Sequence, residues 1–213
     1  MKIKFKKYWR KSSLKKNDDG NFLLNHIYKL KPKNVLEIGI FHGVTSRNIC
    51  NILYKIHGKN FKFTGIDLFL NDNEISKDEF IPVTKFSNPI KFFYYKYIAR
   101  LDPYSEKSVL KLLFKFKENV NIIKGNSNEI LKKINLDFVD YVFLDGGHKY
   151  ETVKIDLKNL TKIILNKGIL MCDDYNLTYA PGVKKAIDEY VKENNFNLRI
   201  LNLRFAEITK KIF

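Results

Sequence analysis

Cysteine is scarce in this chain, and its scarcity excludes two classes of protein. The 213 residues include only Cys50 and Cys172, and both lie in segments that we expect to be buried. We therefore expect no disulfide framework, and we expect a reducing, cytoplasmic location. The sequence has no C-x-x-C pair and no cluster of cysteine with histidine, so it offers no zinc site.

Long apolar runs are absent as well. No stretch approaches the roughly 20 residues of a membrane-spanning helix, and the N-terminus lacks the apolar core of a signal peptide. We therefore expect no membrane span. Hydrophobic residues make up 45% of the chain and charged residues 29%, which is the balance of a globular protein.

Negative charge is in short supply. The chain has 39 Lys and Arg against 23 Asp and Glu, a net charge of +16. This excess favours an acidic partner such as nucleic acid, anionic lipid or an acidic sugar, but a lysine-rich composition explains it at least as well. Residues 1–18 form a basic N-terminal arm that either contacts phosphates or a membrane, or is loosely packed. Its bases, interleaved with Phe5, Tyr8 and Trp9, are Lys2, Lys4, Lys6, Lys7, Arg10, Lys11, Lys15 and Lys16.

Apolar periodicity predicts alternating strands and helices. Strands are expected at 34–40, 61–67, 120–124, 138–144, 168–172, 197–203 and 205–212, and helices at 21–30, 45–57, 105–118, 127–134, 150–164 and 183–191. Such alternation implies a parallel sheet with right-handed crossovers. We therefore predict a single α/β domain over 1–213, with a mostly parallel seven-stranded sheet and helices on both faces.

Residues 70–118 are too many for a plain connection between strands. We interpret this segment as an insert or lid region. Its stretch 90–101 is rich in Phe and Tyr, which is typical of a lid, a substrate wall or the surface of a homodimer.

The stretch Asn34–Gly43, NVLEIGIFHG, organises the rest of the chain. An apolar strand that stops at a glycine turn and opens a helix suits a nucleotide-like ligand, because the turn admits close backbone approach and the helix offers free N–H groups. Glu37, Gly39 and Gly43 follow the pattern E-x-G-x-x-x-G, which differs from the G-x-G-x-x-G of dinucleotide enzymes. We expect His42, inside the turn, to be exposed.

Four carboxylates occur where predicted strands end: Asp67, Asp145, Asp173 and Asp174. The carboxyl ends of parallel strands meet at one edge of a sheet, so these groups should converge. Asp67 is placed to accept hydrogen bonds from ribose hydroxyls. The other three repel one another unless a cation joins them, and oxygen-only ligands favour Mg²⁺, with Mn²⁺ or Ca²⁺ as other candidates. The alternative is that they cap a helix and form a turn.

These features resemble the class I S-adenosylmethionine (SAM) methyltransferases, in whose motif I the E-x-G-x-x-x-G pattern occurs. The spacing of Asp145 from Asp173 and Asp174 is similar to the metal site of catechol-type Mg²⁺-dependent O-methyltransferases and of the macrocin O-methyltransferase group. The phrases FLDGGHKYETVKIDL and KGILMCDDY look like a broader group that includes cephalosporin-hydroxylase-like proteins. Relatives often have the sequence D-G-D-H where this chain has Asp145-Gly146-Gly147-His148. Gly147 replaces the second aspartate of that motif, so any role of the second aspartate is absent here.

The resemblance implies a Rossmann-like fold, SAM as cofactor and Mg²⁺ held by Asp145, Asp173 and Asp174. It implies a polar contact to the adenine amino group just after the third strand, at Asn126, which is also a typical helix cap. Residues assigned to SAM are Glu37, Gly39, Phe41, Gly43, Asp67, Asn126, Ser127 and Asp145.

The implied reaction is O-methylation of a small polyhydroxylated acceptor such as a sugar or glycan unit. Catalytic roles fall to Asp145 and to His148, which either accepts the proton of the hydroxyl or simply begins a helix at the rim. His26 and His57 have no supporting context. The alternatives are a nucleic-acid (RNA) methyltransferase, a non-catalytic SAM-fold binding protein and a hydroxylase-like relative. The absence of a D/N-P-P-Y/F tetrapeptide, which amino-methylating enzymes use, argues against the first.

Overall fold

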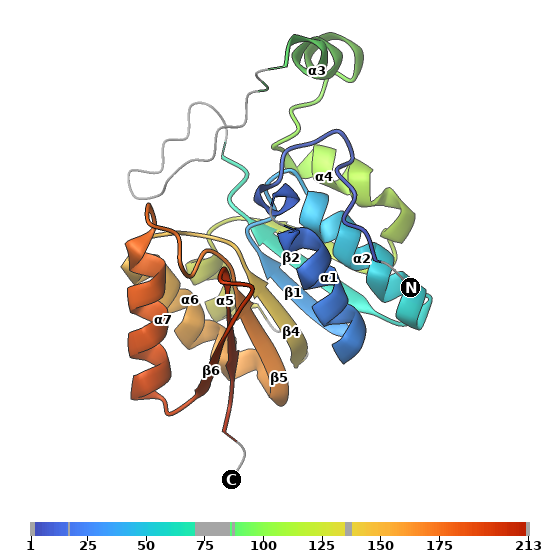
Figure 1. Cartoon of the computed structure of the whole chain (residues 1–213). Helices are drawn as coiled ribbons and strands as arrows, with labels where there is room; N and C mark the ends of the chain where they lie inside the picture. The colour runs from blue at the N-terminus through green and yellow to red at the C-terminus, as the bar shows by residue number, and fades with distance from the viewer. Residues whose placement is uncertain (1–2, 17, 71–85, 87, 135–137, 212–213) are drawn as a thin grey trace.

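The computed structural model describes residues 3–16, 18–70, 86, 88–134 and 138–211. Their centre is a seven-stranded sheet with the order β3-β2-β1-β4-β5-β7-β6, drawn in Figure 1. The strands are β1 Asn34–Ile38, β2 Lys62–Asp67, β3 Val120–Lys124, β4 Val139–Leu144, β5 Ile164–Cys172, β6 Asn197–Leu201 and β7 Phe205–Thr209. The first five pair in parallel, and β7 pairs antiparallel with both β5 and β6. The predicted mostly parallel sheet is confirmed.

Helices cover both faces of this sheet, as the sequence predicts. They are α1 Asp19–Leu30, α2 Val44–His57, α3 Pro89–Phe93, α4 Glu106–Leu113, α5 Ser127–Lys133, α6 Tyr150–Ile163 and α7 Pro181–Glu193. Two short 3-10 helices, η1 Ser13–Lys15 and η3 Phe114–Phe116, and one π-helix, η2 Tyr94–Ile98, complete the set. One apolar core lies under α1, α2 and α4, and a second under α5, α6 and α7. Since both faces of the central strands are covered, β1 and β4 are almost continuously buried.

The boundaries differ from the expected ones mainly at β5. This strand begins at Ile164, four residues earlier than expected, and Ile164 therefore belongs to the strand and not to the preceding helix. Ile164 pairs with Val139 and Ile169 with Tyr141, so the register shifts between these two pairs. Helical and strand periodicities overlap in such short apolar runs, so the pattern alone did not locate the transition.

The described part of the basic arm is packed against the domain and is not loose. Ile3, Phe5 and Leu14 are buried in the core beneath α1 and α2. The side chain of Asn48 accepts a hydrogen bond from the backbone N–H of Lys6 at 2.9 Å and donates one to its carbonyl at 2.8 Å. Of the two alternatives for the arm, loose packing is therefore wrong for its described residues, because apolar residues alternate with the lysines and anchor it.

The described residues of the 70–118 segment divide into two parts. The α4 helix lies against the sheet, and its Val109 and Leu113 are buried. The helical residues of α3 and η2 have no buried side chain, and they stand away from the rest of the molecule in Figure 1. No helix within the described ranges is long and apolar enough to cross a membrane.

Candidate active site

The glycine loop after β1 is held against the loop after β4. Gly39 has φ of +89°, and a Cβ atom there would come within 1.8 Å of the carbonyl oxygen of Asp145. Only glycine fits this contact. Gly43, with φ of +71°, begins α2, so the helix starts directly beside the sheet edge. The predicted strand, glycine turn and helix start are thus present.

Asp67, at the end of β2, fixes the shape of this loop. Its Oδ2 accepts hydrogen bonds from the backbone N–H groups of Ile40 at 2.7 Å and Phe41 at 2.8 Å. Its Oδ1 accepts from the N–H of Phe69 and from the hydroxyl of Tyr104, both at 2.9 Å. Burial raises the pKa of Asp67, and these hydrogen bonds oppose the rise. Sequence reasoning missed Tyr104, which lies in no motif.

Glu37 lies fully buried in β1 beside the loop. Its Oε2 accepts a hydrogen bond from the Ser46 hydroxyl at 2.5 Å, and its Oε1 has no hydrogen-bond partner among the described residues. Burial raises the pKa of Glu37 to about 8, although the hydrogen bond from Ser46 opposes the shift. An unpartnered oxygen in a buried carboxyl is costly and therefore marks a place where a donor from a ligand fits.

The ends of β4 and β5 bring three carboxylates together, as the sequence predicts. Asp145, Asp173 and Asp174 each offer one oxygen, and these oxygens lie within 4.8 Å of one another. They line a cavity of about 10 Å³, which is close to the space that one water or ion needs. The three residues are thus placed to hold a metal ion.

Arg204 is the residue that sequence reasoning missed at this edge. Its guanidinium donates to both oxygens of Asp173, to Oδ1 of Asp174 at 2.9 Å, and reaches Asp19 at 3.4 Å. The antiparallel register places Cys172 opposite Ala206, so two residues further on Asp174 meets Arg204. A lone arginine between two predicted strands gives no signal of this contact.

Burial and mutual repulsion raise the pKa values of two carboxyl groups at the acidic edge, Asp145 and Asp173. Burial, with the charges of Asp173 and Asp174, raises the pKa of Asp145 well above its usual range. Burial also raises the pKa of Asp173 to about 6, although Arg204 opposes this shift. Burial disfavours the charged guanidinium, but hydrogen bonds and charge from Asp173 raise the pKa of Arg204 overall. The single positive charge of Arg204 therefore does not neutralise the three carboxyl groups of the edge when they are ionised.

His148 lies at the rim of the acidic edge. Its Nε2 is 2.9 Å from Oδ2 of Asp174, and its ring lies 6.3 Å from the ring of Tyr179. The Gly146-Gly147 turn leads directly to this histidine and lines the same cavity. His148 therefore lies beside the carboxylates of the acidic edge, and its role as proton acceptor stays a prediction.

Two further residues assigned to SAM are occupied within the protein. The side chain of Asn126 caps α5 by accepting a hydrogen bond from the N–H of Asn128 at 2.9 Å. The hydroxyl of Ser127 donates to Asp156 of α6 at 3.1 Å. The helix-cap interpretation of Asn126 is thus confirmed, and its contact with adenine stays a prediction.

Two histidines differ from expectation. His42 is completely buried, not exposed, and its backbone carbonyl accepts a hydrogen bond from Arg10 at 3.0 Å. Burial and the nearby Arg10 and lysines lower the pKa of His42 to about 3, so this ring is neutral near pH 7. His26, for which the sequence offers no context, pairs with Glu207 at 2.8 Å. Both partners come from remote parts of the chain, which explains why the local pattern missed them.

Comparison with known families decides what this arrangement belongs to. A family model described as a methyltransferase domain matches residues 36–175, which are 140 of the 213 residues. The chain belongs to the methyltransferase-domain family. The match runs from the glycine loop to the acidic edge and confirms the predicted SAM-dependent methyltransferase. No curated protein sequence matches this methyltransferase.

Solved structures with the same fold include several O-methyltransferases. The O-methyltransferase NovP superposes with a TM-score of 0.66 at 18% identity, over 89% of this chain and 80% of that one. The SAH-bound methyltransferase PaMTH1 of Podospora anserina gives 0.62 at 16% identity, over 96% and 81%. CalS11, a TDP-rhamnose 3′-O-methyltransferase of calicheamicin biosynthesis, gives 0.59 at 14% identity, over 91% and 81%. At these identities the likeness shows the fold alone, and the predicted Rossmann-like class I fold is confirmed.

Proposed function

We propose that this methyltransferase is a Mg²⁺-dependent O-methyltransferase, built as a single domain, that acts on a hydroxyl of a small polyhydroxylated acceptor such as a sugar or glycan unit. The observation that carries the proposal is the convergence of Asp145, Asp173 and Asp174 beside the glycine loop. A methyl donor in the loop and a cation at the acidic edge would then lie over adjacent strands.

The charges of the acidic edge suit a divalent cation. Burial holds the pKa of Asp145 high, but a bound cation would favour ionisation of all three carboxylates. They would then carry −3 against the +1 of Arg204, which leaves −2 for the cation to neutralise. Asp145 contributes most to this surplus, since no donor among the described residues hydrogen-bonds its carboxylate. Oxygen ligands of this kind are those that Mg²⁺ prefers. When bound, Mg²⁺ would supply Lewis-acid activation of the acceptor hydroxyl.

The cofactor side suits SAM. Glu37 has an unpartnered buried oxygen that can accept a hydrogen bond from the ammonium group of SAM. Asp67 orients the backbone of the glycine loop, and a ribose hydroxyl would take the place of the Tyr104 hydroxyl among its four donors. We assign the cofactor to the loop residues Gly39, Phe41 and Gly43, together with Glu37, Asp67, Asn126, Ser127 and Asp145.

His148 is the proposed proton acceptor. When its Nε2–H donates to Asp174, the basic lone pair of the ring lies on Nδ1. The carboxylate of Asp174 then stabilises the protonated ring, as carboxylates do for catalytic histidines. His148 thus takes up the proton that the acceptor hydroxyl loses when its oxygen attacks the methyl group.

The acceptor class is inferred from two facts. The rim beside the acidic edge carries His148, Tyr179 and the Gly146-Gly147 turn, which offer polar contacts and open backbone to a hydroxylated ring. CalS11, which shares the fold, is described as a methyltransferase of a nucleotide-linked sugar. A nucleotide sugar is therefore the first acceptor to test.

Titration calorimetry tests the proposal. SAM is titrated into the protein in EDTA and in Mg²⁺. A panel of nucleotide sugars is then titrated in the same two buffers, and transfer of a labelled methyl group from SAM is measured for each sugar. We expect SAM to bind in both buffers and one acceptor to bind and react only with Mg²⁺. SAM binding without any effect of metal would overturn the metal site, and absence of SAM binding would overturn the cofactor assignment.

A further inference from the structure

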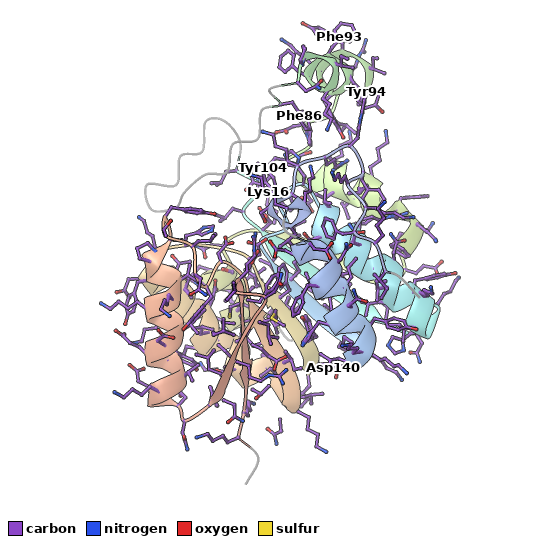
Figure 2. The ribbon with its side chains drawn as sticks, viewed as in Figure 1. Lys16, Phe86, Phe93, Tyr94, Tyr104 and Asp140 are labelled. Carbon is purple, nitrogen blue, oxygen red and sulfur yellow. The ribbon has the colours of Figure 1, made fainter. Side chains whose placement is uncertain are left out.

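The segment Asn88–Ile98, which we name the stalk, stands apart from the folded domain. It contains α3 and η2, ten helical residues with no buried side chain among them. In Figure 2 Phe93 lies at its outer end, and Phe86 lies between the stalk and the domain. Asp140, at the start of β4, lies at the opposite end of the molecule. The stalk thus extends beyond the edge at which the strands end.

One face of the stalk is apolar and uncovered by the described residues. Its apolar stripe, as we name it, consists of Ile90 and Phe93 on α3 and of Tyr94, Tyr97 and Ile98 on the π-helical η2. Their side chains are 68, 56, 37, 52 and 64% exposed. Apolar stripes of surface helices normally face a core, and a stripe that faces solvent marks an interaction surface.

The basic arm extends this surface. The ring of Trp9, which is half exposed, lies 5.4 Å from the ring of Tyr94 in an edge-on contact. The ammonium group of Lys91 lies 5.9 Å from the centre of the Trp9 ring. Tryptophan and tyrosine beside lysine are the side chains that collect at the boundary between lipid and water.

The charge of this region has one sign. Residues 1–17 and 86–101 contain no Asp or Glu. Lys91 and Lys96 belong to the stalk, and Lys4, Lys6 and Lys7 of the arm are exposed. Burial, together with the charges of Lys91, Lys7 and Lys11, lowers the pKa of Lys15 to about 8. The lysines of arm and stalk therefore act as one positive field.

We propose that the stalk and Trp9 form a docking surface for an anionic lipid membrane, on which the enzyme lies without spanning it. The positive field favours an acidic partner, whereas a second copy of this chain would bring like charges together. The most exposed side chains of the stripe are Ile90 and Ile98, which insert among acyl chains but do not stack on bases as aromatic rings do. The proposal does not depend on the identity of the methyl acceptor.

The fluorescence of Trp9 provides a direct test, since it is the only tryptophan of the chain. The full-length protein is mixed with vesicles of phosphatidylcholine alone or of phosphatidylcholine with phosphatidylserine, and binding is also measured by co-sedimentation. We expect a blue shift of the emission and co-sedimentation only with the anionic vesicles, both weakened by salt.

Matched variants separate the stalk from general charge and hydrophobicity. Phe93→Ser should weaken binding roughly tenfold. Phe138→Ser, at a slightly more exposed residue close to Asp140 at the far end, should not. Lys91→Gln with Lys96→Gln should weaken binding roughly 30-fold. The control is Lys162→Gln with Lys167→Gln, two exposed lysines where α6 ends and β5 begins. Unchanged SAM affinity verifies that each variant folds.

Four results would overturn the proposal. The first is an absence of binding to anionic vesicles, and the second is equal loss of binding in the stalk variants and their controls. The third is stalk-dependent binding of a single-stranded RNA in place of vesicles, which would assign the surface to nucleic acid. Stalk-dependent dimerisation without vesicle binding would likewise assign it to a second copy of the chain.

Discussion

Asp67, which is half-buried, and Asp173, which is buried, both lie at the ends of parallel strands, yet the protein compensates them differently. Asp67 accepts hydrogen bonds from three backbone N–H groups and one tyrosine hydroxyl, all of them neutral donors. Asp173 pairs with the cationic Arg204 and shares it with Asp174. Neutral donors orient a carboxylate and shape the loop around it. A shared cation instead leaves surplus charge, which favours a second cation.

The largest expected effect comes from removing Arg204. Arg204→Met leaves the carboxylates of the acidic edge without their internal cation, so the free energy of unfolding in EDTA should fall by roughly 3–5 kcal/mol. Mn²⁺ or Mg²⁺ should restore part of the loss, because the edge is then more negative. Urea unfolding with and without metal measures both effects.

Arg199→Met is the control for this variant. Arg199 lies on the neighbouring strand and pairs with Glu207 at 2.8 Å, but its side chain is largely exposed. The loss should stay below about 1 kcal/mol and should not respond to metal. Equal losses in the two variants would show that Arg204 does not balance a cation site.

Glu37, on the cofactor side of the site, should make the free energy of unfolding depend on pH. The pKa of this carboxyl is about 8 in the folded protein and near 4.5 without the fold. Folding therefore takes up a proton between these values, and the free energy of unfolding should decrease as pH rises from about 5 to 8, by roughly 3 kcal/mol.

Glu37→Gln should remove that part of the pH dependence and leave the variant more stable than the wild type at pH 8. Urea unfolding at a series of pH values provides the comparison. The same slope in both proteins would mean that Glu37 is ionised in the fold and compensated by a donor.

Loss of Asp173, which we assign to the metal alone, should abolish metal binding and leave SAM binding intact. Asp145 is assigned to SAM as well, so a variant of Asp145 tests metal binding only. Asp173→Ala should weaken the binding of Mg²⁺ or Mn²⁺ by at least roughly 100-fold. Because this variant also leaves Arg204 short of a partner, Asp145→Asn provides a milder test. Calorimetry with metal and with SAM distinguishes the two sites. Normal metal binding in both variants would place the site elsewhere.

Asp67→Ala should weaken SAM binding and leave metal binding intact. The glycine loop loses its acceptor, so SAM binding should weaken by roughly tenfold, while metal binding at the ends of β4 and β5 stays normal. Tyr104→Phe removes only one of the four donors to Asp67 and should change SAM affinity less than fivefold, as one hydrogen bond of about 1 kcal/mol would. Equal effects of the two variants would show that the hydroxyl of Tyr104, and not the loop, controls the site.

The sequence by itself determined the alternation of strands and helices, the glycine loop and the convergence of Asp145, Asp173 and Asp174. These follow from local rules, since apolar periodicity sets each element and parallel strands bring their carboxyl ends to one edge. Tertiary structure alone decided that Arg204 compensates the acidic edge, that His42 is buried beneath the arm, and that the stalk presents an apolar stripe outward. Each of these depends on contacts between segments far apart in the chain, and no local pattern encodes a partner that the fold supplies.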